Sequence, residues 1–137
     1  MNISSRCEYA CRAILELATH ADEKEVITSE TIAQRRNIPE KYLVHVLLQL
    51  KRAGLVRSVR GARGGYLLRR SADKITLLDI VTVIDGPVLA PLPVQDDASE
   101  ETAPVWREAA SKIAAELASV TIRDILDRKP TRPMFYI

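Results

Sequence analysis

Two arginines stand among glycines in the stretch LVRSVRGARGGYLL, which runs from Leu55 to Leu68. Apolar, β-favouring residues flank the glycines, and glycines permit a tight reversal, so the stretch predicts a β-hairpin with Arg60 and Arg63 at its tip. A planar guanidinium on a narrow loop can enter a nucleic-acid groove. For the hairpin alone, a solvated turn with two surface arginines is an equally good interpretation.

The basic side chains are concentrated in one block. Eight Lys and Arg residues lie from Lys41 to Arg70 with no Asp or Glu among them, whereas residues 1–40 carry a net charge of −2 and residues 71–137 a net charge of −4. The formal total of +2 therefore conceals a basic block between acidic flanks. Such an uneven distribution favours a surface that meets phosphate.

The sequence before the hairpin predicts the helices that position it. Three amphipathic helices are expected: Ser4 or Ser5 to about His20, Glu30 to Arg36, and Pro39 to about Ala53. The short link between the second and third indicates a helix-turn-helix, and the hairpin that follows would be its wing. The N-terminal part of the third helix would lie nearest the base edges of a major groove. The candidate DNA-contacting residues there are Lys41, Tyr42, Val44 and His45. The alternative is an ordinary amphipathic surface helix.

Cys7 and Cys11 are the only cysteines, and they lie one turn apart in the first expected helix. Two small, partly buried apolar side chains are the ordinary interpretation, and a redox-sensing thiol pair is the alternative. A metal site would need more ligands, because the two histidines, His20 and His45, stand in other segments. We therefore expect no metal and no cofactor.

The chain changes character after Arg70. Thr76 with Asp79 predicts the capped start of a fourth helix, and four prolines with four acidic residues over 87–104 indicate an irregular connection. A long helix over about 105–119 follows, rich in small residues on one side. Because the first three helices already share one core, we expect this helix to pack against its own copy in a homodimer. Two-fold symmetry would present two wings to a palindromic DNA site.

The C-terminal residues Phe135, Tyr136 and Ile137 form an apolar end directly after two prolines. Two interpretations stay open. The end packs on the protein's own dimer, or a partner protein binds the terminal carboxylate and takes the Ile137 side chain into a pocket.

Composition limits the class of protein. With 137 residues, 47% of them hydrophobic and 28% charged, the chain suits one domain with a usable core. No run approaches the roughly 18 apolar residues of a membrane span, and the first residues lack the apolar segment of a signal peptide, so a cytoplasmic protein is expected. An enzyme is not expected, because the glycine loop lacks the Lys-Ser/Thr ending of a phosphate loop and no catalytic set is visible.

Three motifs resemble the winged-helix repressors of the Rrf2 family: IAQRRNIPEKYL (32–43), AGLVRSVRGARGGYLL (53–68) and ITLLDIVTVIDGPV (75–88). The resemblance covers essentially the whole chain. It implies a mainly α fold with a small β-hairpin, namely a winged helix-turn-helix plus a long C-terminal dimerisation helix. It also implies DNA binding by the helix from Pro39, with Arg60 of the wing in the minor groove.

The expected division of the chain follows from the motifs and the elements. A winged helix-turn-helix domain would occupy 1–86 and the acidic, proline-rich connection 87–104. The dimerisation helix and a short following helix would occupy 105–128, and the C-terminal tail 129–137.

Cluster-binding members of the family carry three cysteines in the segment that matches Pro87 to Ala110, where this chain has none. The acidic connection, the WRE at 106–108 and the ending MFYI are instead similar to the family's cysteine-metabolism repressors. That similarity implies repression of sulfur-assimilation genes with cysteine synthase as corepressor. The active site of cysteine synthase receives a C-terminal Ile from serine acetyltransferase, and Ile137 would imitate that ligand.

One departure concerns the base contacts. Where the cluster regulator of the family has an acidic and an amide residue, this chain has Val44 and His45. Its DNA site should therefore differ, and no operator sequence is carried over.

The leading hypothesis is a homodimeric, sequence-specific DNA-binding transcriptional repressor whose partners are double-stranded DNA and, through the tail, cysteine synthase. Two alternatives keep the same fold. One is a redox-responsive regulator that acts through Cys7 and Cys11, and the other is an interaction module that docks a metabolic enzyme without DNA.

Overall fold

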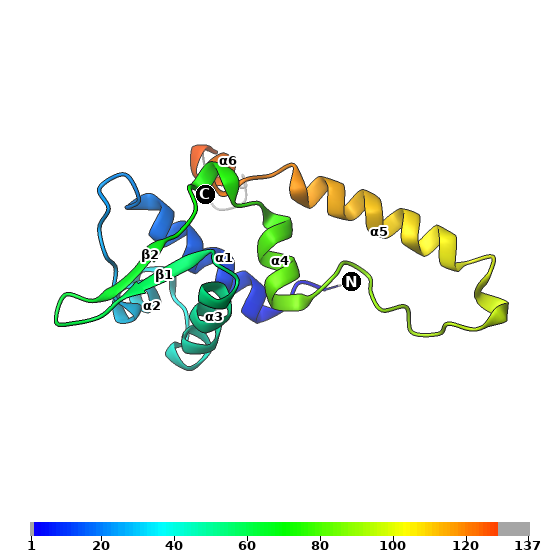
Figure 1. Cartoon of the computed structure of the whole chain (residues 1–137), viewed down its shortest axis with the longest axis horizontal. Helices are drawn as coiled ribbons and strands as arrows, with labels where there is room; N and C mark the ends of the chain where they lie inside the picture. Colours follow the sequence, from blue (N-terminus) through cyan, green and yellow to red (C-terminus); the bar gives the residue numbers. More distant parts are fainter. Residues whose placement is uncertain (1, 129–137) are drawn as a thin grey trace, which may run out of the picture.

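The structure, a computed structural model, describes residues 2–128. Within that range it is mainly helical, with one two-stranded antiparallel hairpin, which confirms the expected fold class. Figure 1 shows a compact body that contains the hairpin, and a long helix that extends away from it. No helix in the described part is both long and apolar enough to cross a membrane.

The first three helices form the body. They are α1 (Ser5–Thr19), α2 (Ser29–Arg36) and α3 (Glu40–Arg52). Ser4 caps α1 by accepting a hydrogen bond from the Cys7 amide, and Thr28 caps α2 through the Thr31 amide. Asn37 adopts a left-handed conformation, with φ of 52°, which turns the chain sharply from α2 towards α3. The expected helix-turn-helix is therefore present.

The inner face of α3 is an apolar stripe at helical spacing. Leu43, Val46, Leu47 and Leu50 are all buried, as the sequence predicts. Gly54, with φ of 79°, follows the helix and turns the chain into the hairpin. The four buried residues of α3 pack with buried residues of α1, α2 and α4, so α3 is held with its opposite face towards solvent.

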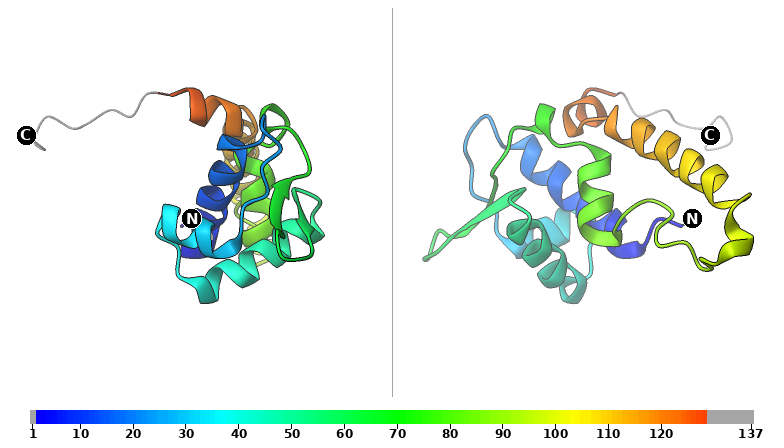
Figure 2. Two further views of the ribbon diagram at one scale, coloured as in Figure 1. Left: turned by 90° about the vertical axis from the view of Figure 1, so that its left-hand side faces the viewer. Right: turned by 45° about the vertical axis from the view of Figure 1, so that its right-hand side comes forward.

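The hairpin consists of β1 (Val56–Val59) and β2 (Gly65–Leu68), with Val56 opposite Leu68 and Val59 opposite Gly65. Ile27 adds an isolated bridge on the other side of β2, where its backbone exchanges hydrogen bonds of 3.0 and 2.8 Å with Tyr66. The short strand expected at residues 26–27 is therefore a single bridge. The hairpin tip projects from the body in Figure 1 and in the right-hand view of Figure 2.

Gly65 allows that close approach of backbones. A Cβ atom there would lie 2.4 Å from the carbonyl oxygen of Ile27, and φ is +156°. Gly65→Ala is expected to lower the free energy of unfolding by about 2 kcal/mol, because it combines a backbone clash with a strained dihedral. Gly54→Ala, at φ +79° with open space around it, is the matched control and should cost about 1 kcal/mol. Equal losses in urea denaturation of the two variants would contradict this account of Gly65.

The rest of the chain forms an arm that returns to the body. Its elements are the 3-10 turn η1 (Ala72–Lys74), α4 (Leu77–Asp85), the 3-10 turn η2 (Asp97–Ser99), α5 (Ala103–Ala118) and α6 (Ile122–Asp127). The expected capping boxes are present at α4, between Thr76 and Asp79, and at α6, between Thr121 and Asp124. The long helix begins at Ala103, two residues earlier than expected, because Pro104 is tolerated in a first helical turn.

The last short helix packs on the body. Ile122 of α6 is fully buried, and its amide donates to the Ile75 carbonyl at 2.8 Å. A bridge between Thr76 and Thr121 joins the start of α4 to the start of α6. Figure 1 shows α6 above α1 and α4. The start of α4 and the start of α6 are therefore both held against the body. Only α5 and the connection before it extend outward.

Candidate nucleic-acid interface

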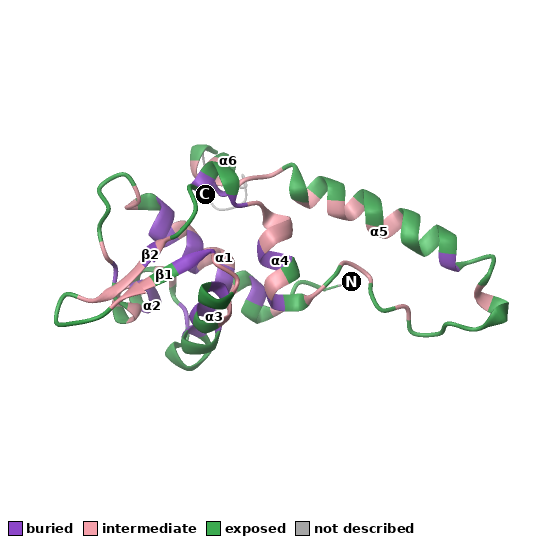
Figure 3. Ribbon diagram, in the orientation of Figure 1, coloured by how far each residue is buried: buried purple, intermediate pink, exposed green. Residues whose placement is uncertain are grey.

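The outer face of α3 is exposed along its length. All four candidate residues on α3, Lys41, Tyr42, Val44 and His45, are exposed, and Figure 3 shows this outer surface of the helix in green. Val44 is 62% exposed, whereas the neighbouring Leu43 and Val46 are buried. An exposed apolar side chain on a helix of this kind can contact a thymine methyl group in the major groove.

Sequence reasoning missed one residue on the same face. Leu48 is 43% exposed and lies one helical turn after Val44, so the two form a short apolar strip. The sequence could have identified Leu48 by its spacing from Val44, because residues four apart in a helix share a face. The exposed Lys51 and Arg52 lie in the last turn of the helix, beyond this strip.

The N-terminal end of α3 is braced against α1. The Tyr42 ring lies 5.7 Å from the ring of Tyr9, and the Lys41 ammonium lies 5.1 Å from the centroid of the Tyr42 ring. Tyr42 therefore has one side fixed in the protein and is 37% exposed. These two contacts limit the rotamers of Lys41 and Tyr42, which lie at the end of α3 that is expected to contact DNA.

The turn between α2 and α3 is held by Arg12 of α1. Its Nη1 atom donates to the carbonyl oxygens of Arg36 and Asn37 at 3.3 and 3.2 Å, and its Nε atom donates to Glu8 at 2.8 Å. The two carbonyls lie at the end of α2, where backbone acceptors lack helical partners. Arg12 was not among the sequence candidates, and its role is to fix the angle of the helix-turn-helix.

A buried carboxylate connects α1 to α2. Glu16 is 5% exposed, and it accepts hydrogen bonds from Arg35 at 3.0 Å and from Arg36 at 2.9 Å, while His20 Nε2 lies 2.9 Å from it. Burial raises the pKa of Glu16, but the hydrogen bonds from Arg35, Arg36 and His20 outweigh it, so the pKa lies below the ordinary 4.5. Arg35 and Arg36 are therefore occupied in holding α2.

The wing presents the two arginines predicted from the sequence. Arg60 and Arg63 are exposed in the loop between β1 and β2, and neither has an ion-pair partner within the described residues. Figure 1 places this loop at one extremity of the molecule, whereas α3 lies in the body and contacts the hairpin through β1. Both α3 and the wing arginines fall within residues 41–70, a stretch of the sequence that has eight basic and no acidic side chains.

The two cysteines lie together on α1, and neither is in a disulfide. Cys7 is buried and Cys11 is half-buried. The hydrogen bond with Cys7 and burial both raise the pKa of the Cys11 thiol, whereas the same contact lowers the pKa of Cys7 against the opposing effects of burial and Asp85. A thiol whose pKa is raised is a poor nucleophile at neutral pH, so Cys11 has the character of a core side chain.

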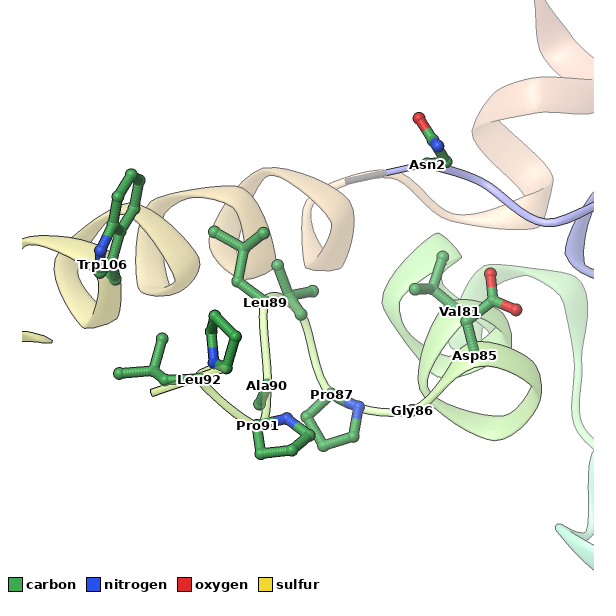
Figure 4. Close-up of a pocket in the computed structure, with 12 residues that line it drawn as sticks. Asn2, Val81, Asp85, Gly86, Pro87, Leu89, Ala90, Pro91, Leu92 and Trp106 are labelled. Carbon is green, nitrogen blue, oxygen red and sulfur yellow. The ribbon is translucent and has the colours of Figure 1, made fainter. Parts of the chain in front are cut away.

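An apolar cavity of about 510 Å³ lies between α4 and the start of α5. Figure 4 shows Val81 and Asp85 of α4 on one side, Trp106 of α5 on the other, and the loop with Leu89 and Leu92 between them. Trp106 is 54% exposed. The candidate tail residues Phe135, Tyr136 and Ile137 lie outside the described residues.

Comparison with known proteins agrees with this geometry. The family model of Rrf2, described as an iron-dependent transcriptional regulator, matches residues 3–128. The HTH-type transcriptional regulator CymR of Bacillus subtilis is 35% identical over 140 residues, which cover 100% of both chains. The structure of that protein, described as the global cysteine regulator of B. subtilis, aligns with a TM-score of 0.81 at 33% identity and covers 95% of this chain and 99% of its own. The structure of T. potens IscR aligns with a TM-score of 0.75 at 30% identity and covers 100% and 97%.

The Rrf2 family model is described as iron-dependent. Iron–sulfur clusters are held mainly by cysteine thiolates, commonly four of them. The chain has two cysteines, both on α1, and none in the connection or in α5. Its residues therefore do not fit a cluster of that kind.

Proposed function

The chain belongs to the Rrf2 family of transcriptional regulators, and we propose that it is a homodimeric, sequence-specific DNA-binding repressor. The proposed DNA-contacting residues are Lys41, Tyr42, Val44 and His45 of α3 with Arg60 and Arg63 of the wing. The domain division into 1–86, 87–104, 105–128 and 129–137 is part of the same proposal.

One observation carries the proposal. The exposed face of α3 and the wing tip belong to one segment of thirty residues that has eight cations and no acid. A duplex that received α3 in its major groove would meet the wing in a neighbouring minor groove. Phosphate contacts from this segment would supply affinity, and the side chains of α3 would supply sequence preference.

The dimer is proposed from the exposure of α5. In this helix of sixteen residues only Ala103 is buried, and Val105 and Trp106 at its start are 60% and 54% exposed. Exposed apolar residues on a long helix that leaves the body indicate a protein interface. A second copy of α5 is the proposed partner at this interface, because the small residues Ala109, Ala110 and Ala114 permit close approach of helices.

The DNA contacts are tested by two substitutions. Arg60→Ala and Lys41→Ala are each expected to weaken binding to the DNA upstream of the protein's own coding sequence by about tenfold, because each removes one direct contact. Lys112→Ala, on α5 and paired with Glu108 at 3.4 Å, is the matched control and should leave affinity unchanged. Fluorescence anisotropy with a labelled duplex measures all three. If Arg60→Ala and Lys41→Ala bind as tightly as Lys112→Ala, the interface is wrongly placed.

The regulated genes are proposed to serve sulfur and cysteine metabolism, with cysteine synthase as corepressor. Two observations support this: the similarity to the cysteine regulator CymR, and a chain that ends in Phe135, Tyr136 and Ile137. An aliphatic residue with a free carboxylate is a ligand that an enzyme pocket can bind through its charge and its side chain.

Deletion of Phe135–Ile137 is expected to weaken binding of cysteine synthase at least tenfold and to leave intrinsic DNA affinity unchanged. Isothermal titration with the purified enzyme measures the first, and anisotropy with the duplex measures the second. Wild-type affinity for the enzyme after the deletion would refute the role of the tail and would leave the DNA-binding proposal standing.

A further inference from the structure

The exposed large apolar side chains of the body gather on the outer face of α3, where Tyr42, Val44 and Leu48 lie. Ile3 is the one other large apolar side chain that is exposed among residues 2–93. The Tyr42 ring packs on α1, whereas Val44 and Leu48 lie outside the core and outside the side chains packed against it in the described part of the chain. Single apolar residues on a surface are ordinary, but two on adjacent turns of one helix favour a contact surface.

The apolar strip of Val44 and Leu48 lies between two cations on one row of the helix. With 3.6 residues per turn, positions 41, 44, 48 and 52 fall on the side of α3 opposite to its buried stripe, and all four are exposed. Lys41 and Arg52 therefore stand at the two ends of the row. A short apolar strip with a cation at each end is complementary to a major groove, whose base edges lie between two phosphate backbones.

The chemistry of the strip selects one group in that groove. Valine and leucine side chains have no hydrogen-bond donor or acceptor, so they discriminate among bases only by apolar contact. The C5-methyl group of thymine is the apolar group that a base pair presents in the major groove, beside hydrogen-bond donors and acceptors. We propose that Val44 and Leu48 are specificity-determining residues that contact the methyl groups of two thymines in each half-site.

The spacing of the two side chains sets the spacing of the two thymines. This inference rests on the proposed DNA-binding function and adds the bases that α3 reads. Val44 and Leu48 are separated by roughly 6 Å along the helix axis, at about 1.5 Å for each residue. Bases stacked along one strand are spaced by roughly 3.4 Å. Where the helix axis follows the groove, the two thymines therefore lie about two base pairs apart.

A protein partner fits the apolar strip less well than DNA does. Each partner in a stable protein complex buries roughly 800 Å², far more than two aliphatic side chains supply. Lysine is depleted in such interfaces, whereas Lys41 and Lys51 are both exposed on α3 and residues 41–70 contain no acid. A DNA duplex matches both features, because its phosphates attract the cations while its base edges offer a narrow apolar contact.

Replacement of thymine by uracil removes the methyl group and leaves the base pair intact, so it tests the contact directly. Two labelled duplexes of the DNA upstream of the protein's own coding sequence are compared by fluorescence anisotropy, one with thymine and one with uracil throughout. Wild-type protein is expected to bind the uracil duplex about tenfold more weakly or worse, since each methyl group buried in a contact contributes up to about fourfold in affinity.

The double variant Val44→Ala, Leu48→Ala is expected to lose most of this penalty and to discriminate between the two duplexes by about threefold or less. Both positions are exposed and alanine favours a helix, so the variant is expected to fold. Val94→Ala is the matched control. Val94 is 62% exposed, as Val44 is, but it lies in the connection before α5, so this variant should keep the full penalty.

The outcomes separate this inference from the proposed function. Equal affinity of wild-type protein for the thymine and uracil duplexes would overturn the inference and leave DNA binding standing. The same is true if the double variant shows the full wild-type penalty. A protein that binds neither duplex would overturn the proposed function together with the inference.

Discussion

Ile113→Glu on α5 is expected to convert the protein from dimer to monomer and to weaken operator binding roughly 100-fold. Ile113 is half-buried on the side of α5 that also carries Ala109, Ala110 and Leu117, and a carboxylate there would have to be desolvated in a helix–helix contact. The loss in DNA affinity is large because two linked half-site contacts bind about 10² to 10⁴ times more tightly than one. A palindromic site read by a monomer loses that advantage.

Sedimentation equilibrium measures the oligomeric state, and anisotropy with the operator duplex measures affinity. Ala115→Glu is the matched control, since it adds the same charge to an exposed position of the same helix. We expect Ala115→Glu to remain dimeric. A dimeric Ile113→Glu with unchanged DNA affinity would show that α5 does not form the interface.

Glu16→Gln is expected to lower the free energy of unfolding by about 3 kcal/mol. Removal of the charge leaves Arg35 and Arg36 without their anionic partner, and breaking a buried ion pair costs about 3–5 kcal/mol. The expected loss lies at the low end, because the Arg35 and Arg36 side chains are 49% and 29% exposed. Since α2 is held through these arginines, hydrogen exchange should accelerate in α2 more than in α4.

Glu8→Gln gives the control for Glu16→Gln. Glu8 also pairs with an arginine, Arg12 at 2.8 Å, but the Glu8 side chain is 54% exposed whereas that of Glu16 is 6% exposed, so its loss should cost less than about 1 kcal/mol. Urea denaturation of the two variants measures the difference, and equal losses would contradict the role assigned to Glu16.

The pH dependence of stability gives a second measurement of Glu16. Because its folded-state pKa is lowered, the carboxylate stabilises the protein above its unfolded pKa near 4.5. That contribution is lost as the pH falls through the folded-state pKa. Wild-type protein should therefore lose stability on acidification below about pH 4.5 more steeply than Glu16→Gln.

Much of the fold could be predicted because its signals are local. Ser4, Thr28 and Thr76 are residues whose side chains cap helices wherever the backbone allows it, and the structure has them as caps. The buried stripe of α3 follows from a period of 3.6 residues. Arg60 and Arg63 could be assigned to a hairpin tip because the glycines between two β-favouring runs leave few other conformations.

What the sequence does not reveal are contacts between distant segments. Glu16 has the sequence pattern of a surface residue on an amphipathic helix. Its burial depends on Arg35 and Arg36, nineteen and twenty residues later, packing against it. The packing of α6 on the body depends in the same way on the hydrogen bond that the Ile122 amide donates to the Ile75 carbonyl. No local pattern encodes such pairings, since they arise only when the whole core has assembled.

The salt dependence of DNA binding tests the central claim most directly. If α3 and the wing bind phosphates through the basic segment 41–70, log K should fall linearly with log salt, with a slope of about −0.9 for each phosphate neutralised. We predict a slope of about −4 or steeper for wild-type protein on its operator duplex, and a shallower slope for Arg60→Ala. Affinity that does not change between low and high salt would contradict a DNA-binding role for this surface.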